Sequence, residues 1–117
     1  ARSKGANASV KANLSNIRPQ AEIIYGNVTP NSYATVCADG TVVAALTAAD
    51  SAGGGTGSAS AAANKCINTS SAWAASAGLR TAEGTSTAWC VDYTGKSEGV
   101  TTAQAAAISA TGPVVCP

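Results

Sequence analysis

Apolar residues recur at helical spacing near the start of the chain, in steps of four, three, four and three residues. At 100° per residue these positions fall in one stripe about 80° wide, which predicts a single helix over residues 1–26 with one face on a core. Pro19 lies inside the pattern and cannot donate to the carbonyl of Ser15, so a kink is expected there. The helix packing face consists of Val10, Leu14, Ile17, Ala21 and Ile24.

Charged residues form a second line along the same predicted helix, about 40° wide and well away from the apolar stripe. Two interpretations of this line are open, a solvated face or a contact surface for a neighbouring subunit. Ile23 lies off the apolar stripe, and a helix with apolar character on two sides often packs on two sides. The candidate subunit-contact residues are Lys4, Lys11, Arg18, Glu22 and Ile23.

Residues 27–70 are predicted to form a connecting loop, because turn residues such as Pro30 and Asn31 follow the helix directly. A second, weaker helical segment is expected within the loop, over residues 42–50, with Thr41 as its N-cap. Residues 51–64 are nearly all Ala, Ser, Gly and Thr, a composition that suits a mobile surface loop.

Strand patterns begin after this loop. Residues 71–79, 87–93 and 97–102 predict three strands of an antiparallel meander, with a turn at 94–96. A short helical turn at 103–107 and an extended tail complete the chain. This order predicts an α+β fold in a single domain, residues 1–117, with one long N-terminal helix packed on a small antiparallel sheet and a disulfide-tied C-terminal loop.

The core available to such a fold is thin. Among 117 residues, 27 are Ala, whereas Leu, Ile and Val together supply 17 and Phe none. The net charge is +1, so the chain is not self-repelling. A domain that buries so little apolar surface needs a covalent constraint or a partner to offset the conformational entropy lost on folding.

Four cysteines can supply that constraint, and they are Cys37, Cys66, Cys90 and Cys116. The chain has no C-x-x-C pair and no His, which disfavours zinc. Two disulfides are therefore expected, and with them an oxidising compartment, the alternative being four buried thiols. Three pairings are open, of which the sequential one, Cys37 with Cys66 and Cys90 with Cys116, is favoured.

The remaining chemistry is sparse. Without His there is no imidazole base or ligand, and no nucleophile elbow or phosphate-cradling loop occurs, so no enzyme, cofactor or metal site is expected. Asp92 and Glu98 offer too few oxygens for calcium. Basic residues on the helix, Lys4 and Lys11 among them, keep a DNA- or surface-binding module as an alternative, weakly supported by a net charge of +1.

Three segments resemble bacterial type IV pilins. Residues 4–25, K-G-A-N-A-S-V-K-A-N-L-S-N-I-R-P-Q-A-E-I-I-Y, are similar to the second half of the pilin N-terminal helix. Residues 32–37, S-Y-A-T-V-C, are similar to the segment that follows it, and residues 88–97, A-W-C-V-D-Y-T-G-K-S, to the central hairpin of the same subfamily.

The resemblance implies a structural subunit of a pilus on the bacterial cell surface, anchored in the inner membrane before assembly. It implies self-assembly through an N-terminal hydrophobic half-helix that these residues lack, with a processed and methylated N-terminus, other pilins and the assembly machinery as partners. The Cys90 and Cys116 pair matches the family's C-terminal disulfide-bounded loop. A minor pilin or a type II secretion pseudopilin is the alternative, and motility, adhesion and DNA uptake are not distinguished.

Overall fold

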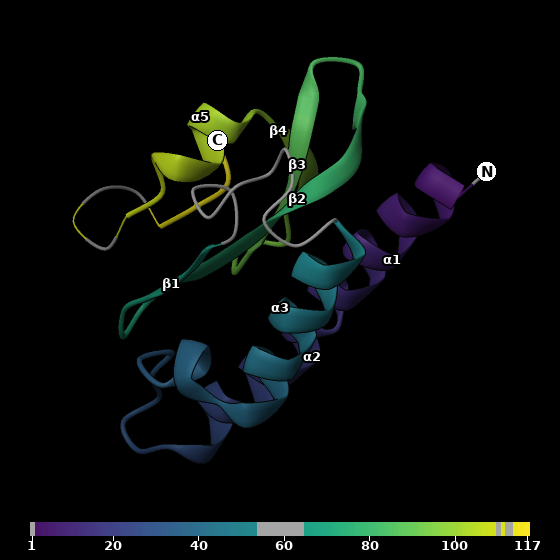
Figure 1. Cartoon of the computed structure of the whole chain (residues 1–117). Coiled ribbons are helices and arrows are strands. Elements are labelled where there is room, and N and C mark those ends of the chain that lie inside the picture. The colour runs from purple at the N-terminus through teal and green to yellow at the C-terminus, as the bar shows by residue number, and fades with distance from the viewer. Residues whose placement is uncertain (1, 54–64, 110, 112–113) are drawn as a thin grey trace.

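The computed structural model describes residues 2–53, 65–109, 111 and 114–117, and its principal extents are 45 × 25 × 21 Å (Figure 1). The helical elements are α1 (Arg2–Ser15), α2 (Ile17–Asn27), the 3-10 turn η1 (Val36–Ala38), α3 (Gly40–Ala52) and α5 (Thr102–Ala106). The strands are β1 (Lys65–Asn68), β2 (Trp73–Glu83), β3 (Ser86–Asp92) and β4 (Ser97–Val100).

The N-terminal helix consists of two segments, α1 and α2, that join at Asn16, directly after Ser15. Asn16 keeps helical dihedrals (φ −69°, ψ −16°) and donates to the carbonyl of Ala12 at 3.1 Å, so the backbone stays helical through the junction. Ser15 is the residue whose carbonyl would accept from position 19, where proline has no N–H to donate. The junction therefore falls where the sequence places a missing hydrogen bond.

The expected connecting loop, residues 27–70, contains regular structure and needs correction. Helix α3 occupies Gly40–Ala52, and its N-cap is Asp39 where Thr41 was expected. The Asp39 carboxylate accepts from the backbone N–H groups of Thr41 and Val42, at 3.0 and 3.2 Å. The glycine-rich part of the expected surface loop, residues 54–64, lies outside the described residues.

The four strands form one antiparallel sheet in sequence order, β1-β2-β3-β4. The meander predicted for β2, β3 and β4 is confirmed, and β1 adds an edge strand that the sequence pattern did not reveal. Glu83 pairs with Ser86 across the β2–β3 turn, where Gly84 adopts a positive φ of 66°. Such backbone geometry favours glycine, because a side chain would clash there.

Helices cover both faces of the sheet, so the expectation of one helix laid on a sheet is too simple. On one face α1 and α3 pack on β2, with α2 packed against α3, and on the other lie α5 and the C-terminal tail (Figure 1). Side chains alternate along β2 and β3 between these two layers. The helix-side core is centred on Trp73, Leu14, Ile17, Leu79 and Val91. The tail-side core is made of Ala72, Ala74, Ala88, Cys90, Val100, Ala105, Ile108, Val114 and Cys116.

Helix α3 ends where it meets the sheet. A Cβ at Gly53, the residue after α3, would collide with the carbonyl oxygen of Gly78 on β2. Only a residue without a side chain allows this approach, so glycine sets how closely the helix end docks on the strand.

Candidate functional site

The structure joins Cys37 to Cys66 and Cys90 to Cys116, which is the sequential pairing. The two disulfides differ in surroundings. Cys90 and Cys116 are fully buried in the tail-side core, whereas Cys37 and Cys66 are half-buried. Beside the Cys37–Cys66 disulfide, the side-chain oxygen of Asn68 accepts from the backbone N–H of Cys37 at 2.8 Å, and its NH₂ group donates to the carbonyl of Ala34 at 3.0 Å. The Cys37–Cys66 bond thus ties the segment before α3 to the edge strand β1.

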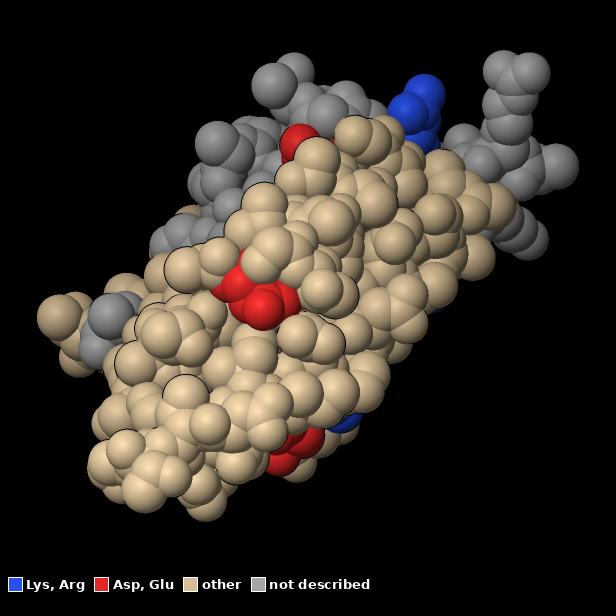
Figure 2. All heavy atoms as spheres, turned by 90° about the horizontal axis from the view of Figure 1, so that it is seen from below, with Lys and Arg blue, Asp and Glu red and all other residues tan. Residues whose placement is uncertain are grey.

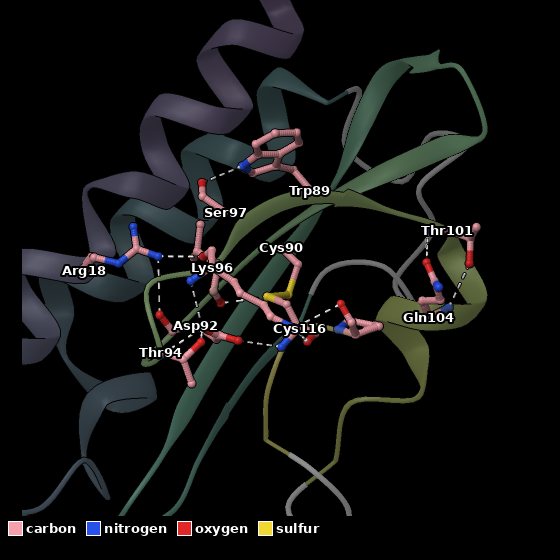
Figure 3. Close-up of a disulfide and its surroundings, with 12 residues drawn as sticks. Arg18, Trp89, Cys90, Asp92, Thr94, Lys96, Ser97, Thr101, Gln104 and Cys116 are labelled. Atoms are coloured by element: carbon pink, nitrogen blue, oxygen red, sulfur yellow. Dashed lines mark hydrogen bonds between the residues drawn. A yellow bond between two sulfur atoms is a disulfide. The ribbon is translucent and has the colours of Figure 1, made fainter.

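Asp92, at the end of β3, is a fully buried carboxylate beside the other disulfide (Figure 3). Its Oδ1 accepts from Thr94 N at 2.9 Å, from Thr94 Oγ1 at 2.6 Å and from Lys96 N at 3.2 Å. Its Oδ2 accepts from the backbone N–H of Cys116 at 2.7 Å. One carboxylate thus shapes the β3–β4 turn and holds the C-terminal tail against the sheet.

The same hydrogen bonds describe the surroundings of the acidic pair Asp92 and Glu98. Both oxygens of Asp92 already accept hydrogen bonds, so the carboxylate is committed to the backbone. In the described part of the chain, no group of three or more His, Cys, Asp and Glu residues is placed to hold a metal ion.

Arg18 connects the helix to the same turn. Its guanidinium donates to the carbonyl of Lys96 at 2.7 Å and to that of Asp92 at 3.4 Å (Figure 3). The Lys96 ammonium in turn donates to the carbonyl of Cys116 at 3.1 Å. Helix α2, the β3–β4 turn and the disulfide-tied tail are therefore linked in one chain of hydrogen bonds.

Lys11 also faces the sheet. Its ammonium forms a 2.8 Å ion pair with Glu83 and lies 4.5 Å from the centre of the Trp89 ring. The buried Asn7 amide donates to Glu83 at 3.0 Å and to the carbonyl of Thr81 at 2.8 Å. Hydrogen bonds from Lys11 and then from Asn7 hold the pKa of Glu83 below its ordinary value.

Glu22 accepts a 2.8 Å hydrogen bond from the Tyr33 hydroxyl. Tyr33 stacks on Tyr25, with ring centres 4.3 Å apart, and lies 6.3 Å from Tyr93 in a tilted arrangement. Burial, and then the bond to Glu22, raise the pKa of Tyr33 to about 12. The structure thus gathers three of the five aromatic residues of the chain into one cluster.

The charged line on the helix makes contacts within the chain. Lys11 and Arg18 direct their charges at Glu83 and at the β3–β4 turn, and the exposed Glu22 bonds to Tyr33. The subunit contact expected for these residues stays a prediction. Hydrophobic periodicity cannot reveal such contacts, because they depend on where the sheet edge lies. The side chain of Lys4 is outside the described residues. Ile23 is the large apolar side chain of the set, and it is 54% exposed.

The outer face of α1 and α2 carries one charged residue, Glu22, among its described side chains. Figure 2 shows a largely uncharged surface on the underside of the molecule, interrupted by a few acidic and basic patches. The uncharged residues of the outer face are Ala8, Ser9, Ala12, Ser15, Asn16, Pro19 and Ile23.

The expected helix packing face lies against the sheet. Val10, Leu14, Ile17 and Ala21 are fully buried, and Ile24 is half-buried against the same core. The outer face and the packing face are therefore opposite sides of α1 and α2, both poor in charge.

An apolar pocket lies in the opposite layer, between α5 and the tail. Its volume is about 250 Å³, and its lining is Gln104, Ala107, Ile108, Val115 and Pro117. None of these five lining residues has an ionisable side chain.

Comparison of the chain with protein-family models, with curated proteins and with solved structures finds no match. Within the described residues, no helix has both the length and the apolar character needed to cross a membrane. What the structure defines is a class: an α+β domain with helices on a four-stranded antiparallel sheet and two disulfides.

Proposed function

We propose that this chain is a structural subunit of an extracellular filament of the type IV pilus kind, with a pilin-like fold and no catalytic role. The observation that carries the proposal is the outer face of α1 and α2, on which, from Ala8 to Ile23, Glu22 is the one exposed charged side chain among those described. The resemblance of residues 4–25 and 88–97 to pilins supports it. Two disulfides support export to a non-reducing compartment.

The physical argument concerns desolvation. A helix on the surface of a monomer normally keeps charged residues on its solvent side. Packing such a side against a neighbour would bury charge at high cost. Here Lys11 and Arg18 turn to the sheet instead. The outer face therefore packs against a second helix with Glu22, which accepts a hydrogen bond from Tyr33, as its one described charged neighbour.

The proposed filament contains many copies of the chain, with α1 and α2 directed toward its axis. An apolar helical segment preceding residue 1 in the native protein forms part of the proposal, as the anchor before assembly and as the innermost layer afterwards. No observation favours a pseudopilin. A DNA-binding module is disfavoured, because two of its candidate basic residues, Lys11 and Arg18, are engaged within the chain.

The test places one charge on the outer face. Ala12→Glu, introduced into the native protein in its source cells, should abolish surface filaments, because assembly would bury an unpaired carboxylate. Ala103→Glu is the matched control, since Ala103 is exposed on α5, in the layer on the opposite face of the sheet. Filaments are sheared from cells, examined by electron microscopy and identified by mass spectrometry.

Both variants should melt at a temperature close to that of the parent, because both sites are exposed. Filaments that contain this chain and persist in Ala12→Glu cells would exclude the outer face as the packing surface. Surface fractions that never contain the parent chain would overturn the filament proposal altogether.

A further inference from the structure

The two disulfides differ in how far a reductant can reach them. Cys90 and Cys116 are fully buried, and the buried Asp92 carboxylate holds the backbone N–H of Cys116 beside them at 2.7 Å. Cys37 and Cys66 are each half-buried, at the β1 edge of the sheet (Figure 1). Reduction begins when a thiolate attacks a disulfide sulfur, so its rate depends on access. A thiol in solution should therefore react with the Cys37–Cys66 bond first.

Strand β1, which carries Cys66, has little apolar burial of its own. It is an edge strand, and within the sheet it pairs with β2. Its described side chains, Cys66, Ile67 and Asn68, are all half-buried, whereas β2 is buried throughout residues 73–79. Segments with few buried apolar contacts open at a low free energy. The disulfide is therefore a large part of what holds β1 in place.

The other end of the disulfide is anchored independently. Cys37 lies in η1, where its neighbour Val36 is fully buried in the helix-side core. Tyr33, just before η1, is buried as well and bonds to Glu22 at 2.8 Å. When the disulfide opens, η1 should keep its place and β1 should gain freedom.

We propose that the Cys37–Cys66 disulfide is a reducible latch, which a dithiol opens in the folded chain so that β1 loosens from η1. One thiolate of the dithiol attacks a sulfur of the bond and forms a mixed disulfide, and its second thiolate then displaces the protein sulfur. The dithiol leaves as a disulfide, and its two electrons and two protons leave Cys37 and Cys66 as thiols. The inference goes beyond the proposed function and does not depend on assembly.

The first experiment measures which disulfide opens. The folded chain is incubated with increasing concentrations of dithiothreitol, samples are blocked with N-ethylmaleimide, and the labelled cysteines are identified by peptide mass spectrometry. Cys37 and Cys66 should become labelled together, about tenfold faster than Cys90 and Cys116 or more, because burial shields the second pair. Equal rates, or earlier labelling of the buried pair, would overturn the latch.

The second experiment measures what the opening does. Hydrogen exchange of the selectively reduced chain should show roughly tenfold lower protection at the backbone amides of β1 and at the amide of Cys37, which donates to Asn68. The amide of Cys116, which donates to Asp92, is the internal control and should keep its protection. Unchanged protection at β1 would overturn the latch. Lost protection at Cys116 would do so too, because the chain would then open globally.

A matched variant keeps the latch open without a reductant. Cys37→Ser combined with Cys66→Ser should show the exchange pattern of the selectively reduced chain, and dithiothreitol should not change its β1 amides. A variant with the protection of the oxidised parent would contradict the proposal. Oxidised glutathione, added after dithiothreitol is removed, should restore the bond and the β1 protection of the parent. Failure to restore them would exclude a reversible latch.

Discussion

The two faces of the sheet are held by different means. The helix-side core contains Trp73, Leu14, Ile17 and Leu79, all of them large and almost fully buried. The tail-side core contains mainly Ala and Val, with the Cys90–Cys116 disulfide in its midst. Where large side chains are scarce, a covalent bond and the buried Asp92 carboxylate take over the role that apolar burial has on the other face.

The largest effect should come from removing the tail-side disulfide. The loops closed by the two disulfides have sequence separations of 26 and 29, so chain entropy alone gives each about 3.5 kcal/mol. Cys90→Ser with Cys116→Ser also buries two hydroxyl groups in an apolar cluster and should cost more than Cys37→Ser with Cys66→Ser. Urea unfolding of both double variants measures the two losses in the free energy of unfolding. Equal losses would show that burial of the two new hydroxyl groups adds nothing to the cost of losing the disulfide.

Next in size is the helix-side core. Leu14→Ala should lower the free energy of unfolding by about 3 kcal/mol, since it leaves a cavity under α1. The conservative Leu14→Met serves as control and should cost less than about 1.5 kcal/mol. A loss below 1 kcal/mol for Leu14→Ala would mean that the helix is held mainly by its polar links to the sheet.

Asp92→Asn should lower the free energy of unfolding by about 2 kcal/mol. The amide retains one acceptor oxygen but loses a charge-assisted bond, either at the β3–β4 turn or at Cys116 N. Glu98→Gln on β4 removes the same charge nearby and should cost little. Thermal unfolding of both variants tests this, and an Asp92→Asn chain as stable as its parent would remove the carboxylate from the account of the tail side.

A smaller effect should come from the Lys11 and Glu83 pair, which lies near the surface. Glu83→Gln should cost less than about 1 kcal/mol at neutral pH. Because the pKa of Glu83 is lowered in the folded chain, its contribution is present above its ordinary value of 4.5 and lost as the pH falls further. The free energies of unfolding of the parent and of Glu83→Gln should therefore converge as the pH falls below 4.5. A difference that stays constant with pH would contradict the assignment of this contribution to the ionised Glu83 carboxylate.

The smallest effect should come from the raised pKa of Tyr33, because this shift changes the free energy of unfolding only at alkaline pH. The pKa of Tyr33 is about 12 when folded against 10.0 ordinarily, so its contribution is complete below pH 10 and is lost as the pH rises toward 12. Ultraviolet titration should show one phenol ionising near pH 12 that is absent in Tyr33→Phe. An identical late phase in Tyr33→Phe would assign it to another tyrosine.

Sequence periodicity was informative where one face of an element is apolar and the other is not. The spacing of Val10, Leu14 and Ile17 placed a helix against a core, and bulky residues at 87–93 placed β3 in a meander. The sequence pattern does not predict strand β1, because its four residues, Lys65–Asn68, contain one aliphatic side chain and show no alternation. The N-cap is Asp39, which stands directly before the helix, and the prediction of Thr41 is wrong.

The polar contacts between helix and sheet could not be predicted from the sequence, because they join residues far apart in the chain. Lys11 meets Glu83 and Arg18 meets Lys96 across more than 70 residues of sequence. The Asn7 amide has no local signal at all. Asp92 did carry one, since an Asp two residues before Thr94 and ahead of Gly95 is typical of a side-chain-capped turn, but its reach to Cys116 is not encoded nearby.

Because Lys11 and Arg18 point toward the sheet, salt should have little effect on contacts made through the opposite side of the helix. Salt screens charges over about 8 Å at physiological concentration, and it weakens only those contacts in which exposed charges take part. Packing through Ala12, Pro19 and Ile23 involves none. Screening by salt would therefore weaken contacts between these three residues very little as the ionic strength rises.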